Sequence, residues 1–174
     1  MGAMPDPVAK NLKIQSSSLG LIVIQPITLY VDEIEKASLL LFPHGVSEGE
    51  LNVAVEWAAS TQTPIFCLSD DVEKFEDEGF GSYRFHKIDG YREVDFQGGS
   101  IEFYPARKRR VSGIKGITQE VVEFLGLAKH PGYHVLIRPR GEAPVLYLAT
   151  PVIDASEWRT LTKANPQSIV GSGA

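Results

Sequence analysis

The sequence predicts a mixed α/β fold with a mixed sheet, for two reasons. Short apolar and β-branched runs occupy residues 19–24, 38–42 and 64–68, and such runs are typical of buried strands. Between the second and third runs, apolar side chains recur at helical spacing over residues 51–58. Because strand, helix and strand follow one another, we expect a parallel βαβ unit at the centre of the fold.

The domain is expected to begin after a short lead-in. Residues 1–11 look like a tag remnant and a flexible segment, and residues 12–174 are expected to form one domain. Residues 12–14 are the first expected strand. Residues 19–24 and 27–31 are two apolar runs with a short break between them, so we expect them to form a hairpin.

The middle of the chain is expected to hold an acidic segment and then a β-meander. Residues 70–78 are strongly acidic, which is typical of a solvated helix face or loop. Dipeptides such as Asp-Gly and Gly-Gly are typical of hairpin turns. Three successive antiparallel strands are therefore expected at residues 83–86, 93–96 and 100–104, separated by Asp89-Gly90 and Gly98-Gly99.

The C-terminal part is expected to contain two helices and three strands. Residues 118–127 have a helical pattern. Asp154 followed by Glu157 predicts a capping box, in which each side chain accepts a hydrogen bond from a backbone N–H of the first helical turn. This second helix should run to about Lys163, with Trp158 as a packing residue. The expected strands are residues 133–138, 144–148 and 168–170.

Composition and charge argue against several classes of protein. With 43% hydrophobic and 22% charged residues, the chain is expected to fold. The net charge of −5 disfavours general nucleic-acid binding. The single cysteine, Cys67, excludes an internal disulfide and a cysteine-rich zinc site, and we expect a buried structural thiol. Because membrane-spanning, signal-peptide and disulfide patterns are all missing, we expect a cytoplasmic protein.

The order of these elements resembles that of the metallo-β-lactamase-fold superfamily. Ser16-Ser17-Ser18 lies between the opening strands and Asp32 follows them, as at the start of that fold. The likeness continues through later strands and covers nearly the whole chain; it is greatest to the branch that contains ascorbate-6-phosphate lactonase. The segments that carry it are residues 38–42, 64–68, 132–137 and 145–148. The resemblance implies a partial αββα sandwich, a fold that metal-dependent hydrolases use.

The residues that carry the family's chemistry are replaced in this chain. Family hydrolases bind two metal ions through the motif Thr-His-x-His-x-Asp-His after the fourth strand. A later histidine and a bridging aspartate complete that site, and residues 104–108 and 149–151 lack both. The resemblance therefore implies a degenerate domain that has lost its metal site. Depending on the register, the motif's ligand positions hold Pro43, Gly45, Ser47 and Glu48, or His44, Val46, Glu48 and Gly49.

The leading hypothesis is a non-catalytic domain that acts through protein association, without a cofactor or catalytic residues. Family members continue for another half, so the resemblance also implies that this chain is truncated. A half-fold would leave apolar surface uncovered, and surfaces of that size normally meet a partner. We therefore expect a homodimer.

Two alternatives remain open. One is a metal-dependent hydrolase of phosphoesters or lactones, with zinc at a rearranged site; the weak candidate ligands are His44, Glu48 and Asp154. The other is a module that binds an anionic small molecule, because arginine side chains match phosphate oxygens. Its candidate residues form the one dense basic cluster, Arg107, Lys108, Arg109 and Arg110.

Overall fold

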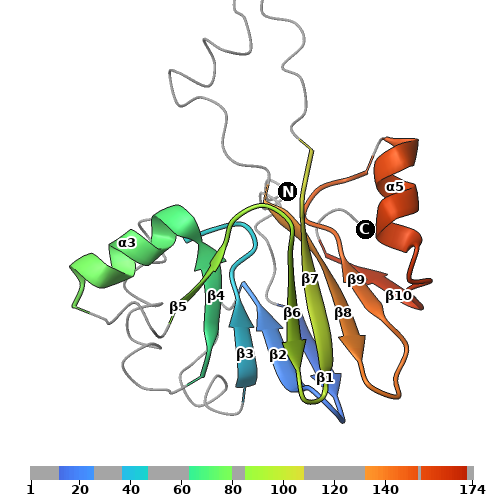
Figure 1. Cartoon of the computed structure of the whole chain (residues 1–174), viewed down its shortest axis with the longest axis horizontal. Coiled ribbons are helices and arrows are strands. Elements are labelled where there is room, and N and C mark those ends of the chain that lie inside the picture. Colours follow the sequence, from blue (N-terminus) through green and yellow to red (C-terminus); the bar gives the residue numbers. More distant parts are fainter. Residues whose placement is uncertain are drawn as a thin grey trace, which may run out of the picture.

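The computed structural model describes residues 12–25, 37–46, 63–79, 85–107, 132–152 and 154–171. Their strands form two β-sheets that pack face to face (Figure 1). Helix α3 (Ser69–Asp77) packs on the first sheet and helix α5 (Ala155–Thr162) on the second. The mixed α/β class expected from the sequence is therefore confirmed.

The first sheet contains five strands, and their order in the sheet is their order along the chain. β1 and β2 form an antiparallel hairpin, whereas β2, β3, β4 and β5 pair in parallel. The parallel pairing expected for the runs at 38–42 and 64–68 is thus confirmed. The strands are β1 (Leu12–Ser16), β2 (Gly20–Ile24), β3 (Ala37–Leu41), β4 (Ile65–Leu68) and β5 (Phe85–Ile88).

The second sheet also contains five strands in chain order. β6 to β9 pair in an antiparallel manner, and β10 adds to β9 in parallel. The strands expected at 93–96, 100–104, 133–138, 144–148 and 168–170 are all present. They are β6 (Arg92–Phe96), β7 (Gly99–Pro105), β8 (Tyr133–Pro139), β9 (Val145–Tyr147) and β10 (Ser168–Val170).

Three of the expected elements lie outside the described residues. They are the strand at 27–31 and the helices at 51–58 and 118–127. Residues 27–31 were expected to pair with β2. In the described part of the chain, the neighbours of β2 are β1 on one edge and β3 on the other.

The prediction that the first strand belongs to the meander is wrong. β5 lies parallel to β4 in the first sheet, and β6 belongs to the second sheet, so Asp89-Gly90 links two sheets and forms no hairpin. Gly90 has a φ of +69°, a conformation that glycine adopts readily. Phe85 packs on the α3 side of its sheet and Ile88 on the opposite side. Burial on both faces is typical of a parallel strand, which explains the difference.

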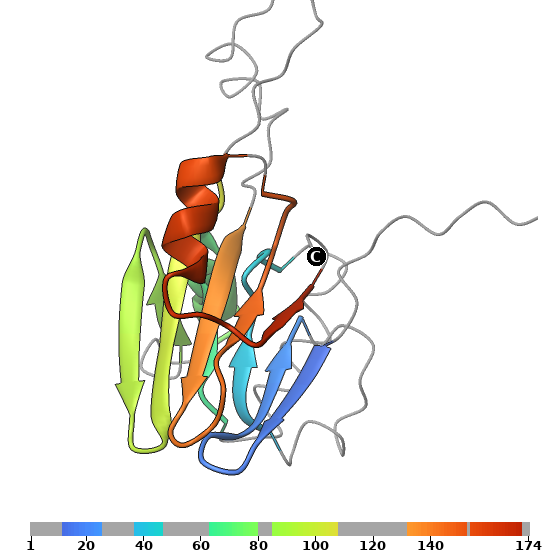
Figure 2. The same ribbon diagram turned by 90° about the vertical axis from the view of Figure 1, so that its right-hand side faces the viewer.

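Side chains that alternate along the strands build an αββα arrangement. The core between the sheets includes Ile22 and Leu41 from the first sheet with Ile101 and Ile137 from the second. The outer face of the first sheet packs against Val72 and Phe75 of α3. Figure 2 shows α5 lying across the outer face of the second sheet. There, Leu161 of α5 packs on Leu136, Leu146 and Leu148.

Turns from the two sheets meet at one edge of the sandwich. The β1–β2 turn approaches the β6–β7 turn so closely that a Cβ atom on Gly98 would lie 2.0 Å from the backbone oxygen of Ser18. The Ser17 N–H donates to Oε1 of Glu142 in the β8–β9 turn, at 2.7 Å. This edge, at the bottom of Figure 1, is therefore closed by a backbone approach between two turns and by the Glu142 side chain of a third.

Individual side chains confirm some expectations and correct others. Cys67 is buried, as expected, and burial raises the pKa of its thiol to about 12. The acidic segment is helical, but Asp71 is buried, so the expected solvated face is wrong for this residue. Trp158 was expected to pack inside, yet 39% of it is exposed.

Neither α3 nor α5, the helices of the described segments, is long and apolar enough to cross a bilayer.

Candidate functional site

The candidate site is the strand-end loop, residues 43–46, which follows β3. In open parallel sheets, the C-terminal strand ends are the usual location of ligand sites. The resemblance also places the family's metal motif here. The loop's backbone turns sharply at Gly45, which has a φ of +85°. A Cβ atom at Gly45 would lie 3.2 Å from the Asp71 carboxylate, so the glycine permits close packing on α3.

One half of the loop is held by Gln25 and Tyr147. The His44 N–H donates to Oε1 of Gln25 at 3.0 Å, and Nε2 of Gln25 donates to the Gly45 carbonyl at 3.2 Å. Nε2 of the His44 ring shares a hydrogen bond of 2.6 Å with the Tyr147 hydroxyl. Gln25 follows β2 and so ties the loop to its own sheet, whereas Tyr147 ends β9, so its bond to His44 joins the two sheets.

The other half of the loop is held by α3 and by the start of β8. The Val46 N–H donates to Oδ2 of Asp71 at 2.9 Å, and Nζ of Lys74 donates to the Val46 carbonyl at 3.0 Å. The Tyr133 N–H donates to the Pro43 carbonyl at 3.0 Å. Lys74 also forms an ion pair with Asp71. The loop therefore has a fixed backbone, supported by polar side chains from three separate elements.

A second imidazole, His134 on β8, lies buried near this loop. Its Nδ1 accepts a hydrogen bond from the Ala149 N–H at 3.1 Å, so its proton must be on Nε2. Nε2 lies 2.9 Å from Oε1 of Glu157 on α5 and donates to it. Burial lowers the pKa of His134 by more than the Glu157 carboxylate raises it. His134 therefore holds α5 against the sheet as a neutral imidazole.

Acid should weaken the fold because His134 and His44 both have lowered pKa values. Burial is the main cause at each ring, and for His44 the nearby His134 adds to it. Below the ordinary value of 6.5, the unfolded state therefore binds more protons than the folded state, and stability falls as the pH falls. We expect urea unfolding midpoints to be lower at about pH 5 than at about pH 7.5. Replacing His134 with Asn should reduce this difference, and an unchanged difference would contradict the assignment.

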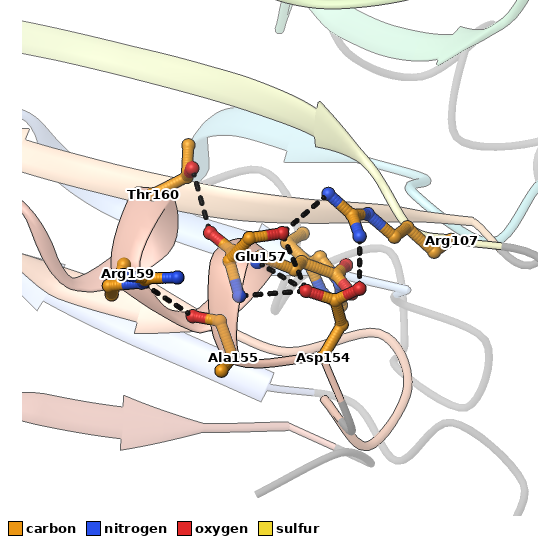
Figure 3. A network of polar contacts seen from close by, with 8 residues as sticks. Arg107, Asp154, Ala155, Glu157, Arg159 and Thr160 are labelled. Carbon is orange, nitrogen blue, oxygen red and sulfur yellow. Dashed lines mark hydrogen bonds and ion pairs between the residues drawn. The ribbon is translucent and has the colours of Figure 1, made fainter.

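Asp154 and Arg107, proposed from the sequence for different sites, contact each other. Oδ1 of Asp154 caps α5 by accepting from the backbone N–H groups of Ser156 and Glu157. Nη1 of Arg107 forms an ion pair with Oδ2 of Asp154, and Nη2 donates to the Ser156 hydroxyl (Figure 3). Hydrogen bonds from the Ser156 hydroxyl and from the backbone lower the pKa of Asp154 to about 2. The carboxylate therefore stabilises the start of α5.

The predicted capping box forms only in its first half. Asp154 accepts from the first turn, as expected, but Oε1 of Glu157 is bonded to His134. The residue that was expected to complete a cap thus belongs to a buried pair between helix and sheet.

The remaining sequence candidates are separated or lie outside the described residues. His44 is bonded to Gln25 and Tyr147, whereas Asp154 is bonded to Arg107 and to residues of α5, so the described hydrogen bonds place the two in different networks. Glu48, Lys108, Arg109 and Arg110 lie outside the described residues.

Sequence reasoning missed the residues that hold the loop. Gln25 follows an apolar strand and precedes a proline, a setting that gives no sequence signal of a polar contact. Its special position is seen only in the structure, where its φ is +50°. Asp71 and Lys74 were hidden in a run of charges that resembles a solvent-exposed helix face. Tyr147 was assigned to a strand, although a tyrosine at a buried strand end usually seeks a polar partner.

The described residues near the loop that could act as zinc ligands are engaged in hydrogen bonds within the fold. Ligands to zinc need an available lone pair on nitrogen, oxygen or sulfur. Both ring nitrogens of His134 are engaged, and the carboxylate of Asp71 accepts from Val46 and Lys74. Among the described residues, no three His, Cys, Asp or Glu side chains gather in a group that could hold a metal ion.

Comparisons with known proteins place the fold among hydrolase structures. No family model and no curated protein sequence matches the chain. The structure is similar to an isothiocyanate hydrolase from Delia radicum gut bacteria, with 12% identity, a TM-score of 0.62 and coverage of 91% of this chain and 67% of that one. It is also similar to a possible metal-dependent hydrolase from Veillonella parvula, with 15% identity, a TM-score of 0.60 and coverage of 91% and 66%. This chain spans about two thirds of each, and it has their hydrolase-like α/β fold.

Proposed function

We propose that this chain is a non-catalytic domain of the metallo-β-lactamase type that acts through association with a second copy of itself. The main support is the use that the chain makes of its strand-end loop. The one imidazole in the described loop, His44, is bonded to Tyr147 across the two sheets. In a family hydrolase this loop presents imidazoles to metal ions; here it supports the fold.

The bonds around the loop support the same conclusion. A catalytic metal site keeps an open coordination position and ligands aimed at it. In this chain, Asp71 and Gln25 instead satisfy backbone groups of the loop itself. Such bonds contribute roughly 0.5–1.5 kcal/mol each to stability, and together they favour a structural role for the loop.

Exposed aromatic and aliphatic side chains support association. Among the described residues, the exposed large apolar side chains include Trp158 on α5 and Ile169 on β10. Tryptophan is enriched among the residues that contribute most to protein interfaces. Trp158 lies on the helix that packs on the second sheet, and Ile169 lies on the last strand in that sheet's order. We place the self-association surface in this C-terminal part of the chain.

One preparation tests this proposal. The protein is purified without a metal-affinity column, its mass in solution is measured by light scattering over a range of concentrations, and its metal content by elemental mass spectrometry. We expect twice the mass of one chain at high concentration. Trp158→Ser should shift the population toward monomer, because it removes an exposed apolar side chain from the proposed contact. Arg159→Ala on the same helix should leave the mass in solution equal to that of the wild type at each concentration. A monomer at every concentration would overturn the association.

A second candidate function is a metal-dependent hydrolase. It is favoured by the likeness to two hydrolase folds and by the position of His44 after β3. The same metal analysis separates the two functions. About two zinc ions per chain, lost in His44→Ala, together with lactone or phosphodiester turnover, would replace the non-catalytic proposal with this one.

A further inference from the structure

β10 is an outermost strand that carries no charged side chain. In the described sheets the outermost strands are β1 and β5 of the first sheet and β6 and β10 of the second (Figure 2). Natural proteins commonly protect such strands from pairing with another chain by placing charged side chains on them. Lys13 of β1, Lys87 of β5 and Glu93 of β6 follow this rule. β10 departs from it, since residues 164–171 hold neither acidic nor basic side chains.

Backbone hydrogen bonds show which way the polar groups of β10 point. The Leu148 N–H donates to the Val170 carbonyl at 2.8 Å, so the backbone groups of Val170 face β9. Consecutive residues of a strand direct their backbone groups to opposite sides. The N–H and C=O groups of Ile169 therefore point away from β9, and no described residue bonds to them. The edge thus offers one donor and one acceptor to an added strand.

The side chain of Ile169 lies on the outer face of the second sheet. Its partner in the register is Leu146, which packs against α5, whereas the neighbouring Val170 packs on the core between the sheets. Ile169 is 38% exposed, although it lies on the same face as a well-packed helix. An added strand would cover this apolar side chain.

Trp158 extends the apolar surface onto α5. Thr160 and Lys163 line a hollow together with Tyr104 of β7, so that flank of the helix faces β7. With about 3.6 residues per turn, Trp158 projects from the other flank, toward β9 and β10. The exposed apolar side chains of α5 and β10 therefore lie on the same side of the sheet, next to its uncharged edge.

The lack of charge favours a second copy of this chain as the partner. In a twofold contact each side chain near the axis meets the same residue or its neighbour in the other copy, so any charge there meets a like charge. The net charge of −5 makes two copies repel each other in general. Residues 164–171 are free of this repulsion. A strongly charged partner would instead be matched by charges of the opposite sign.

We propose that β10 pairs in an antiparallel manner with β10 of a second copy, which joins the two second sheets into one continuous sheet. Ile169 lies at the twofold axis, where its N–H donates to the carbonyl of the partner's Ile169 and its own carbonyl accepts the equivalent bond. The pairing rests on the self-association proposed above and specifies its geometry.

Two variants at one position separate the side chain from the backbone. Ile169→Ala removes the apolar contact and should raise the dissociation constant of the dimer about threefold. Ile169→Pro also removes the N–H that points away from β9, a change that an edge strand tolerates. Because both hydrogen bonds at the axis are then lost, the dissociation constant should rise about tenfold further. Analytical ultracentrifugation measures the constants, and circular dichroism checks that each variant is folded.

Cross-linking tests the register of the two strands. Directly opposite residues of a hydrogen-bonded antiparallel pair have Cα atoms about 5.5 Å apart, which a disulfide can span. Ile169→Cys should therefore form a disulfide between two copies when oxidised glutathione takes up the two electrons. The native Cys67 is buried, with its pKa raised to about 12, and should stay reduced. Gln97→Cys, exposed between β6 and β7, is the matched control and should remain largely unlinked.

The outcomes separate the strand pairing from association in general. A wild type that is monomeric at every concentration overturns both. A dimer with equal dissociation constants for Ile169→Ala and Ile169→Pro, and with no more cross-link for Ile169→Cys than for Gln97→Cys, overturns the pairing and leaves the association in place. If Ile169→Pro does not fold, the comparison of the two cysteine variants decides the matter.

Discussion

Replacing Phe66 with Ala should lower the free energy of unfolding by about 4 kcal/mol. Phe66 lies on β4 in the core between the sheets and is 1% exposed. Its ring stacks on Phe103 of the opposite sheet at 5.7 Å and on His86 at 4.6 Å. The alanine variant would leave a cavity where the two sheets meet, because rigid strands on both sides cannot move in to fill it.

Urea unfolding, followed by far-ultraviolet circular dichroism, measures this loss. Phe66→Leu keeps most of the volume and should cost about 1 kcal/mol. A loss below about 1 kcal/mol for Phe66→Ala would mean that the ring does not fill the core as described.

The second large effect is expected at Gly98, where alanine should cost about 3 kcal/mol. A Cβ atom there would lie 2.0 Å from the backbone oxygen and 2.6 Å from the backbone carbon of Ser18. Main-chain atoms cannot avoid the new methyl group by changing a rotamer, so the two turns must separate. That separation would also strain the bond between the Arg140 N–H and the Gly98 carbonyl.

Gly90 provides the matched control for Gly98. A Cβ atom at Gly90 would meet nothing within 4 Å, but its φ of +69° disfavours alanine by about 1 kcal/mol. Gly98→Ala should therefore lose at least twice as much stability in the same urea experiment. Equal losses for the two variants would contradict the close approach of the turns.

The sequence predicted the strands of the core better than their assignment to sheets. β3 and β4 were expected because their apolar residues face both sides of a buried sheet. The prediction placed β5 in the wrong sheet because a turn dipeptide such as Asp89-Gly90 does not determine whether the strands on its two sides pair with each other. Which sheet a strand joins depends on contacts between residues that are distant in sequence.

The candidate sites were harder to predict for the same reason. The ring of His44 meets Tyr147 more than 100 positions later, and Glu102 meets Arg138. No spacing rule relates such pairs. The role of Glu157 shows the limit of local rules, since its spacing from Asp154 predicted a cap, but the nearby His134 is its partner.

The order of the strands has a consequence for how the protein forms during synthesis. Within each sheet, strands that lie side by side are also consecutive along the chain, and the described strands of each sheet come from one half of the chain. The first sheet can therefore complete its backbone pairing before the ribosome has made β6. Until the second half arrives, the apolar face that includes Ile22 and Phe66 stays open to water. The nascent first half is thus the stage most exposed to aggregation or to capture by chaperones.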